Sequence, residues 1–159
     1  DITSVPTGEG WLYVAGVKYL YTCEVVGYAM GARMTTDLVR HALGNAVGAK
    51  RPRPGVIHHS DRGSQYCAHD YQDQLRQFGM IPSMSRKGHC YDNAPMESVW
   101  GTLKNELVHH RRYTTREQAR REITEYIELF YNRQRRHSRL GNRSPAAFAQ
   151  QWARQQSAA

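Results

Sequence analysis

Three carboxylates stand in positions from which they could hold divalent metal ions. Asp1 leads a short extended segment, Asp61 follows a short apolar-led run, and Glu97 lies near the start of a segment with helical spacing. Fifty-nine residues separate the first two carboxylates and thirty-five separate the second two. If the first and fourth strands of a sheet are neighbours, Asp1 and Asp61 lie side by side, and a helix across the sheet edge brings Glu97 within reach.

Carboxylates that converge in this way favour metal-dependent phosphoryl transfer. Their charges repel one another at low local dielectric, and divalent cations relieve that repulsion. Hard oxygen ligands select Mg²⁺ or Mn²⁺, and two such ions about 4 Å apart stabilise the attacking and leaving oxygens of an in-line displacement. The spacing by itself is weak support, because the fourteen acidic residues form many triples. Each of the three could instead be a turn, capping or solvated residue.

The segments that must position these carboxylates follow an alternating pattern of strands and helices. Period-two segments rich in Val and Tyr indicate strands, and apolar residues three and four apart indicate helices. The pattern shows no internal repeat and no long linker, and it indicates an α/β layer fold. In chain order we predict strands over 1–5, 11–20 and 24–33, a helix from 36, a strand over 56–59, a helix ending at 79, a strand over 80–84, a helix from 94, and a helix that follows a capping box at 114–117.

Length and composition fit one globular domain. A chain of 159 residues, 40% of them apolar, can bury roughly 70% of its unfolded surface. No apolar run approaches the roughly 20 residues of a membrane span, and no signal-peptide pattern is present. The three cysteines are odd in number and include no C-x-x-C pair. This argues against a disulfide framework or a zinc finger and fits a reducing cytoplasm.

The positive charge is concentrated in the last third of the chain. Residues 1–103 hold ten Lys/Arg and nine Asp/Glu, a net charge of +1, whereas residues 104–159 hold twelve and five, a net charge of +7. Such a basic stretch favours a polyanion, most simply a nucleic-acid backbone. A solvated helix face with a basic tail is the alternative that charge alone leaves open. The densest cluster is Arg133, Arg135, Arg136, Arg139 and Arg143.

Six segments match the motifs of one known family. They are residues 1–3, 9–13, 59–66, 92–98, 100–106 and 131–141. On these residues the chain resembles the integrase-core transposases of bacterial insertion sequences, which are relatives of retroviral integrases in the ribonuclease-H-like superfamily. The match runs essentially end to end, and the gap of thirty-five residues is the family's signature spacing. The resemblance implies that Asp1, Asp61 and Glu97 are catalytic residues that together bind two Mg²⁺ or Mn²⁺ ions.

The resemblance also implies a fold and a domain division. We expect a ribonuclease-H-like α/β fold, with a mixed central sheet of about five strands flanked by helices. The catalytic core is expected over residues 1–132, with a first strand truncated at its N-terminus, and residues 133–159 are expected to form a basic extension. The chain departs from the family pattern at Tyr19, where an acidic residue is usual, and at Cys23, where Arg is common.

The function that the resemblance implies is transposition of an insertion sequence. We expect metal-dependent cleavage of DNA ends, followed by attack of the freed 3′-hydroxyl on another phosphodiester, without a covalent enzyme–DNA intermediate. The expected partners are element and target DNA and further copies of the chain assembled on DNA, in the bacterial cytoplasm at the nucleoid and away from membranes. Two alternatives stay open: a nuclease of the same fold that does not join strands, and an inactive DNA-binding remnant.

Several residues outside the triad are predicted to contact DNA. Lys104 lies two helical turns after Glu97 and on the same face, which favours a phosphate contact over an ordinary exposed lysine. Asn93 could cap the helix or touch DNA, and capping is favoured. The loop 85–93 would order on DNA beside the active site, unless it is only a surface loop. The remaining predicted DNA contacts are Arg86, Lys87, Arg135 and Arg136.

Two histidines beside Asp61 could suggest a metal ligand or a general base. His58 and His59 are adjacent on a strand, so one faces inward and one outward. A buried, hydrogen-bonded histidine is the favoured interpretation. We assign no zinc site, because the cysteines and histidines lack zinc spacing. Trp100 and Trp152 are interpreted as core and docking residues rather than as platforms for stacked bases.

Overall fold

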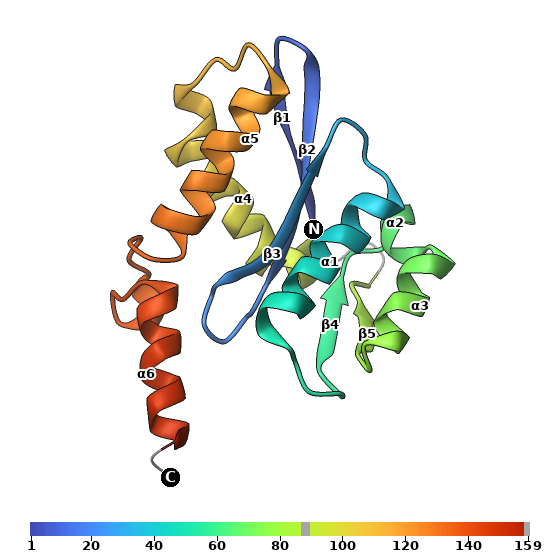
Figure 1. Ribbon diagram of the computed structural model, residues 1–159, viewed down its shortest axis with the longest axis vertical. Coiled ribbons are helices and arrows are strands. Elements are labelled where there is room, and N and C mark those ends of the chain that lie inside the picture. The colour runs from blue at the N-terminus through green and yellow to red at the C-terminus, as the bar shows by residue number, and fades with distance from the viewer. Residues whose placement is uncertain (87–89, 158–159) are drawn as a thin grey trace.

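The computed structural model describes residues 1–86 and 90–157, which fold into two small sheets with helices on both sides (Figure 1). Three strands pair antiparallel in the order β1–β2–β3, and two further strands pair in parallel. The strands are β1 (Ile2–Thr7), β2 (Gly10–Lys18), β3 (Val25–Gly31), β4 (Ile57–Ser60) and β5 (Ile81–Met84).

The helices form two layers. α4 and α5 cover one face of the three-stranded sheet, and α1 covers the other face (Figure 1). On the side of α1, α3 contacts both α1 and β5 of the two-stranded sheet. None of the described helices is long and apolar enough to cross a membrane. The helices are α1 (Thr36–Lys50), α2 (Ser64–Cys67), α3 (His69–Gln77), α4 (Ala94–Glu106), α5 (Arg116–Glu125) with a π-helical continuation (Tyr126–Tyr131), and α6 (Pro145–Ser157), with short 3-10 turns at Cys90–Asn93, Val108–His110 and Ser138–Leu140.

Strand β2 is buried on both faces and separates the two halves of the core. Leu12 and Val14 pack with α4 and α5, whereas Tyr13, Ala15 and Val17 pack with α1 and α3. This alternation follows from the two-residue period of a strand. It means that the even-numbered positions of β2 face the helix that carries Glu97.

Two predicted features differ from the structure. The five strands form two hydrogen-bonded groups, so β1 and β4 share no backbone ladder within the described residues, although the α/β fold class is confirmed. The predicted capping box is shifted by one residue. Thr115 Oγ1 accepts the backbone N–H of Gln118 at 3.1 Å, and the Gln118 side chain accepts the Thr114 N–H at 3.0 Å. The sequence could not separate the two adjacent threonines, because both residue types suit a cap; in the structure Thr115 has the extended backbone and makes the capping bond.

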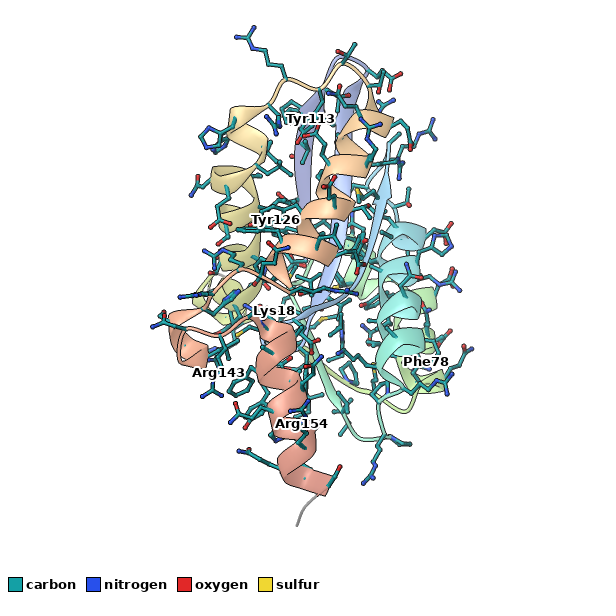
Figure 2. All side chains as sticks on the ribbon, turned by 60° about the vertical axis from the view of Figure 1, so that its left-hand side comes forward. Lys18, Phe78, Tyr113, Tyr126, Arg143 and Arg154 are labelled. Atoms are coloured by element: carbon teal, nitrogen blue, oxygen red, sulfur yellow. The ribbon has the colours of Figure 1, made fainter. Side chains whose placement is uncertain are left out.

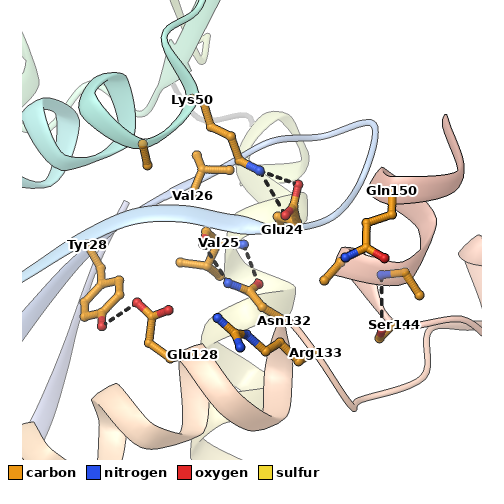
Figure 3. A pocket seen from close by; sticks show the side chains of 13 residues that line it. Glu24, Val25, Val26, Tyr28, Lys50, Glu128, Asn132, Arg133, Ser144 and Gln150 are labelled. Atoms are coloured by element: carbon orange, nitrogen blue, oxygen red, sulfur yellow. Dashed lines mark hydrogen bonds and ion pairs between the residues drawn. The ribbon is translucent and has the colours of Figure 1, made fainter. Parts of the chain in front are cut away.

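The C-terminal helix is attached to the core by aromatic contacts and by Asn132. Tyr21 packs against the rings of Phe148 and Trp152, with centroids 5.5 Å apart in each pair. The Asn132 amide pairs with both backbone groups of Val25, at 3.0 and 2.9 Å, beside a cavity of about 610 Å³ (Figure 3). Trp152 is therefore a docking residue, as predicted, and Trp100 is a buried core residue.

Candidate metal and DNA site

Asp1 pairs with Gly16, near the C-terminal end of β2. Its carbonyl accepts the Gly16 N–H at 2.9 Å, and its own nitrogen donates to the Gly16 carbonyl at 3.1 Å. Residues directly opposite in an antiparallel pair carry their side chains on the same face. Asp1 therefore shares the face of Gly16, which is the face that α4 covers. Its Oδ1 accepts the Ile2 N–H at 2.8 Å.

Asp61 directly follows β4. Its Oδ1 accepts the Gly63 N–H at 2.8 Å, which shapes the turn into α2. The turn is tied to the end of β5, because Arg62 Nε donates to the Ser85 carbonyl at 2.6 Å and the Ser85 N–H donates to the Ser60 carbonyl at 2.9 Å. The carboxyl group is thus fixed at the end of the two-stranded sheet and is half-buried.

The Asp1 amino group lies within range of the charge of Asp61. Burial lowers the pKa of the Asp1 amino group to about 5, and the charge of Asp61 opposes that shift. Burial also lowers the pKa of His58 to about 4, and the Asp1 amino group and His59 add to the effect. The start of β1 and the end of β4 therefore lie within range of each other's charges, although the strands are not paired. That the two carboxylates lie side by side stays a prediction.

The two histidines have structural partners. His58 Nε2 lies 2.8 Å from the Tyr71 hydroxyl, and the half-buried ring packs against the Tyr71 ring. His59 faces the other way, with its ring nitrogens 2.9 and 3.1 Å from the hydroxyls of Ser83 and Ser85. The prediction that one histidine faces inward and is hydrogen-bonded is confirmed.

Glu97 lies in the first turn of α4 and is exposed. This end of α4 lies very close to β2. A Cβ on Gly16 would stand 2.7 Å from Trp100 and 2.8 Å from Met96. Because Gly16 is also the partner of Asp1, the start of α4 lies beside the strand position that holds Asp1. No three His, Cys, Asp or Glu side chains of the described residues already form a metal-holding group. The convergence of Glu97 with the two aspartates stays a prediction.

The donor set is suited to a hard divalent cation. Asp1 and Asp61 offer carboxylate oxygens, and the Oδ1 of each accepts a hydrogen bond from a nearby backbone N–H. Mg²⁺ is commonly held by one or two carboxylates together with waters and substrate phosphates, rather than by a complete protein cage. The pair of aspartates fits that pattern, with Glu97 as the third carboxylate.

Lys104 lies two turns further along α4 and is half-exposed. Within residues 1–86 and 90–157, the Lys104 ammonium has no hydrogen bond or ion pair. Asn93 occupies the N-cap position, but its side chain makes no capping bond, so the favoured prediction of a cap is wrong. The 3-10 turn that precedes α4 gives Asn93 a backbone that is not extended, which explains the difference.

The predicted loop contacts are only partly described. Arg86 is 72% exposed, and its Nε lies 3.6 Å from Asp92 Oδ2, which also accepts the Arg86 backbone N–H at 3.0 Å. Lys87 lies outside the described residues. Arg86 remains on the surface near the start of α4, and its contact with DNA stays a prediction.

The two predicted arginines of the C-terminal cluster differ in their surroundings. Arg135 Nε donates to Glu106 at 2.8 Å, and the same carboxylate accepts the Tyr126 hydroxyl at 2.6 Å. This side chain is 26% exposed and joins the end of α4 to the segment after the π-helix. Arg136 is exposed. Arg135 thus has a structural role that sequence reasoning missed, and Arg136 is the freer of the two for DNA.

Two further residues near the site were not predicted. Arg62 ties the Asp61 turn to β5, and its position inside the matched segment 59–66 was the available signal. Lys18 donates from the end of β2 to the Pro95 carbonyl at 3.0 Å, in the first turn of α4. A lone lysine at the end of an apolar strand was the signal for it.

Comparison with known families gives one consistent match. The family model described as integrase core domain matches residues 1–90, and a second integrase core domain model matches residues 79–145. The chain is 63% identical over 152 residues to the insertion element IS600 uncharacterized 31 kDa protein of Shigella sonnei, covering 96% of this chain and 56% of that protein. It is 47% identical to the transposase for insertion sequence element IS904 of Lactococcus lactis, covering 93% and 58%.

A further relative is the transposase InsF for insertion sequence IS3A of Escherichia coli (strain K12), at 49% identity over 93% of this chain and 51% of that protein. The chain therefore spans about half the length of the curated relatives it matches.

Solved structures share the fold at low sequence identity. The catalytic core domain of the HTLV-2 integrase in complex with magnesium, in a trimeric form, superimposes with a TM-score of 0.70 at 10% identity over 93% of this chain and 91% of that chain. The simian T-cell lymphotropic virus intasome in complex with PP2A regulatory subunit B56 gamma gives 0.76 at 13% identity, over 93% and 51%. The catalytic core domain of the BIV integrase gives 0.66 at 15% identity, over 98% and 95%.

Proposed function

The chain belongs to the integrase core domain family, and from that premise we propose that it is the catalytic core of a bacterial insertion-sequence transposase. Its reaction is metal-dependent cleavage of DNA ends and transfer of the resulting 3′-hydroxyl ends to another phosphodiester. The relatives named as transposases support this proposal, as does the magnesium complex of the HTLV-2 integrase core, which has the same fold. The core extends over residues 1–132, and residues 133–159 are a basic extension.

One observation carries the proposal: the start of α4, the helix with Glu97, lies against Gly16 of β2, and the backbone of Gly16 pairs with Asp1. The carboxylates of Asp1, Asp61 and Glu97 would hold two Mg²⁺ or Mn²⁺ ions, which supply activation of the attacking oxygen and charge stabilisation of the leaving oxygen. Asp1 and Asp61 are preorganised by their backbone hydrogen bonds. The neutral His58 leaves that region without a competing positive charge on the imidazole.

The test is the reversal of strand transfer on a labelled branched oligonucleotide in Mn²⁺. A branched substrate already carries the joined product, so it requires no recognition of a particular terminal sequence. The 3′-hydroxyl next to the branch attacks the branch phosphodiester, a new phosphodiester closes the target strand, and the branching strand leaves with a 3′-hydroxyl. A resealed labelled strand supports a transferase. Cut strands without resealing would show a nuclease, and no cleavage at all would contradict both.

DNA binding by this chain should be weak, tolerant of sequence and steeply dependent on salt. The excess charge lies in residues 104–159, and phosphate contacts carry no sequence information. With about five phosphates neutralised, affinity should fall by about 10²- to 10³-fold between 50 and 200 mM salt. Fluorescence anisotropy with unrelated duplexes measures this. Arg136→Ala should lower the salt slope by about one, whereas Arg76→Ala, paired with Asp73 on α3, should leave it unchanged. Tight binding to one sequence that does not respond to salt would contradict the prediction.

Lys104→Ala should reduce strand transfer without destabilising the protein. The Lys104 ammonium, which has no partner among the described residues, would contact a phosphate near Glu97, and losing one such donor costs about 10²-fold in rate. A half-exposed side chain without partners changes stability by only about 0.5 kcal/mol. The branched-oligonucleotide assay and thermal melting measure the two effects. Lys104→Arg should keep part of the activity, because the guanidinium is wider and planar. Asn105→Ala, the exposed neighbour, is the matched control. Unchanged transfer in Lys104→Ala would leave Lys104 an ordinary surface lysine.

A further inference from the structure

We propose that Lys18 is a positioning residue for Glu97: its ammonium holds the first turn of α4 against the strand that pairs with Asp1. The proposal rests on the metal site proposed above and adds a residue that the resemblance does not assign. Lys18 lies between the α4–α5 layer and the start of α6 (Figure 2). Its Nζ donates to the Pro95 carbonyl at 3.0 Å, across 77 residues of chain and two residues before Glu97.

Lys18 and Gly16 both contact the start of α4. They are two residues apart on β2, with a register shift of the β2–β3 pair before Lys18, and the Lys18 ammonium reaches the Pro95 carbonyl. Gly16 lies against Met96 and Trp100 so closely that a Cβ would stand less than 3 Å from both side chains. The backbone of Gly16 pairs with Asp1 on the other side. One short stretch of β2 therefore contacts both Asp1 and the first turn of α4, which carries Glu97.

The first turn of α4 needs such an attachment. Its N-cap residue, Asn93, makes no side-chain capping bond, and an uncapped first turn frays more readily. Lys18 supplies a contact to that turn from a strand that is itself fixed in the sheet. Because Glu97 lies in this turn, the hydrogen bond to Pro95 limits how far the Glu97 carboxylate can move relative to Asp1.

Fold stability alone does not account for a lysine at this position. Burial lowers the pKa of the Lys18 ammonium, the Cys23 thiol opposes that shift, and the charge of Arg139 adds to it. A cation is also unfavourable at a helix N-terminus, where the macrodipole is positive. An apolar side chain of the same length would avoid all of these costs. What it could not do is donate a hydrogen bond to the Pro95 carbonyl.

The experiment measures Mn²⁺ affinity by titration calorimetry on the 159-residue chain, together with the melting temperature of the metal-free protein. Lys18→Met keeps the length of the side chain and removes the ammonium. We expect a Mn²⁺ affinity about tenfold lower, the size typical for loss of a group that orients a ligand, with a melting temperature unchanged or higher. Lys18→Arg, which can still donate to Pro95, should recover most of the affinity. Lys50→Met is the control, because Lys50 pairs with Glu24 at the far end of α1.

A double-mutant cycle with Glu97→Gln separates the failure of this proposal from the failure of the metal site. If Glu97→Gln leaves Mn²⁺ affinity unchanged, Glu97 is not a ligand and the proposed site is wrong. If Glu97→Gln lowers the affinity and Lys18→Met does not, Lys18 has no positioning role. If Lys18→Met lowers the Mn²⁺ affinity equally in the wild type and in Glu97→Gln, Lys18 does not act through Glu97, and the proposal is also overturned.

Hydrogen exchange provides a readout that requires no metal. Lys18→Met should speed amide exchange at residues 98–100, the first amides of α4 that can bond to carbonyls of its first turn, and leave exchange in α1 unchanged. Should Lys18→Met fail to fold, Lys18→Gln, which keeps a polar end but is too short to reach Pro95, gives the same two readouts. Exchange at residues 98–100 that matches the wild type in a folded variant would overturn the proposal.

Discussion

Asp61→Asn is expected to abolish metal-dependent strand transfer while the metal-free protein keeps its stability. The amide loses the negative charge that a divalent cation requires, and the loss of metal assistance removes roughly 4 kcal/mol or more of transition-state stabilisation, about 10³-fold in rate. The fold is spared because Asn retains an oxygen that can accept the Gly63 N–H, which the wild-type Oδ1 accepts at 2.8 Å. The branched-oligonucleotide assay measures the loss directly.

Thermal stabilisation by Mn²⁺ provides an independent measurement for the same variant. A ligand that binds only the native state at 100 times its Kd stabilises it by about 2.7 kcal/mol, which raises the melting temperature by roughly 5–10 °C for a protein of this size. Asp61→Asn should remove that rise. Asp70→Asn, an exposed carboxylate in the first turn of α3, should keep it. If Asp61→Asn instead unfolds the metal-free protein, Asp61 is a structural residue and the proposed metal site fails.

Among substitutions that add a single methyl group to β3, Gly27→Ala should destabilise the protein most. A Cβ at Gly27 would stand 2.5 Å from the Ala42 carbonyl oxygen and 2.6 Å from the Ala46 Cα. Both are backbone atoms of α1, so relief requires the whole helix to move away from the sheet. Overpacking of this kind costs about 3 kcal/mol, which lowers the melting temperature by roughly 6–12 °C. Urea unfolding and thermal melting measure the change.

A second glycine of the same β3–α1 pair provides the control. Gly48 is exposed near the end of α1, and a Cβ there meets no atom within 4 Å. Gly48→Ala should therefore stabilise the protein by about 0.5–1 kcal/mol, because alanine has the higher helix propensity and loses less backbone entropy. A Gly27→Ala variant as stable as the wild type would mean that α1 lies further from β3 than the structure has it.

The local patterns of the sequence were sufficient for the fold class, and the family resemblance supplied the candidate triad. Alternation in β2 and helical spacing in α1 and α4 are properties of ten to fifteen consecutive residues, so each predicts its own element. The spacing of Asp61 and Glu97 belongs to the motifs that the family resemblance uses. The predicted fold class is confirmed because periodicity and turn residues are encoded within short segments of the chain, whereas the triad stays a prediction.

The tertiary structure alone decided which polar groups meet. Arg135 was predicted as a DNA contact from its place in a basic cluster, but its pairing with Glu106 joins residues 29 apart. Lys18 and Pro95 are 77 apart, and no local pattern links them. The close approach of Gly27 to α1 depends on how a helix packs on a strand. Such contacts arise from the packing of elements distant in sequence, and the free energy that selects them is absent from any single segment. For this reason the sequence could propose the three carboxylates, while only the folded chain showed the contact of Lys18 with Pro95, on which the proposed positioning of Glu97 rests.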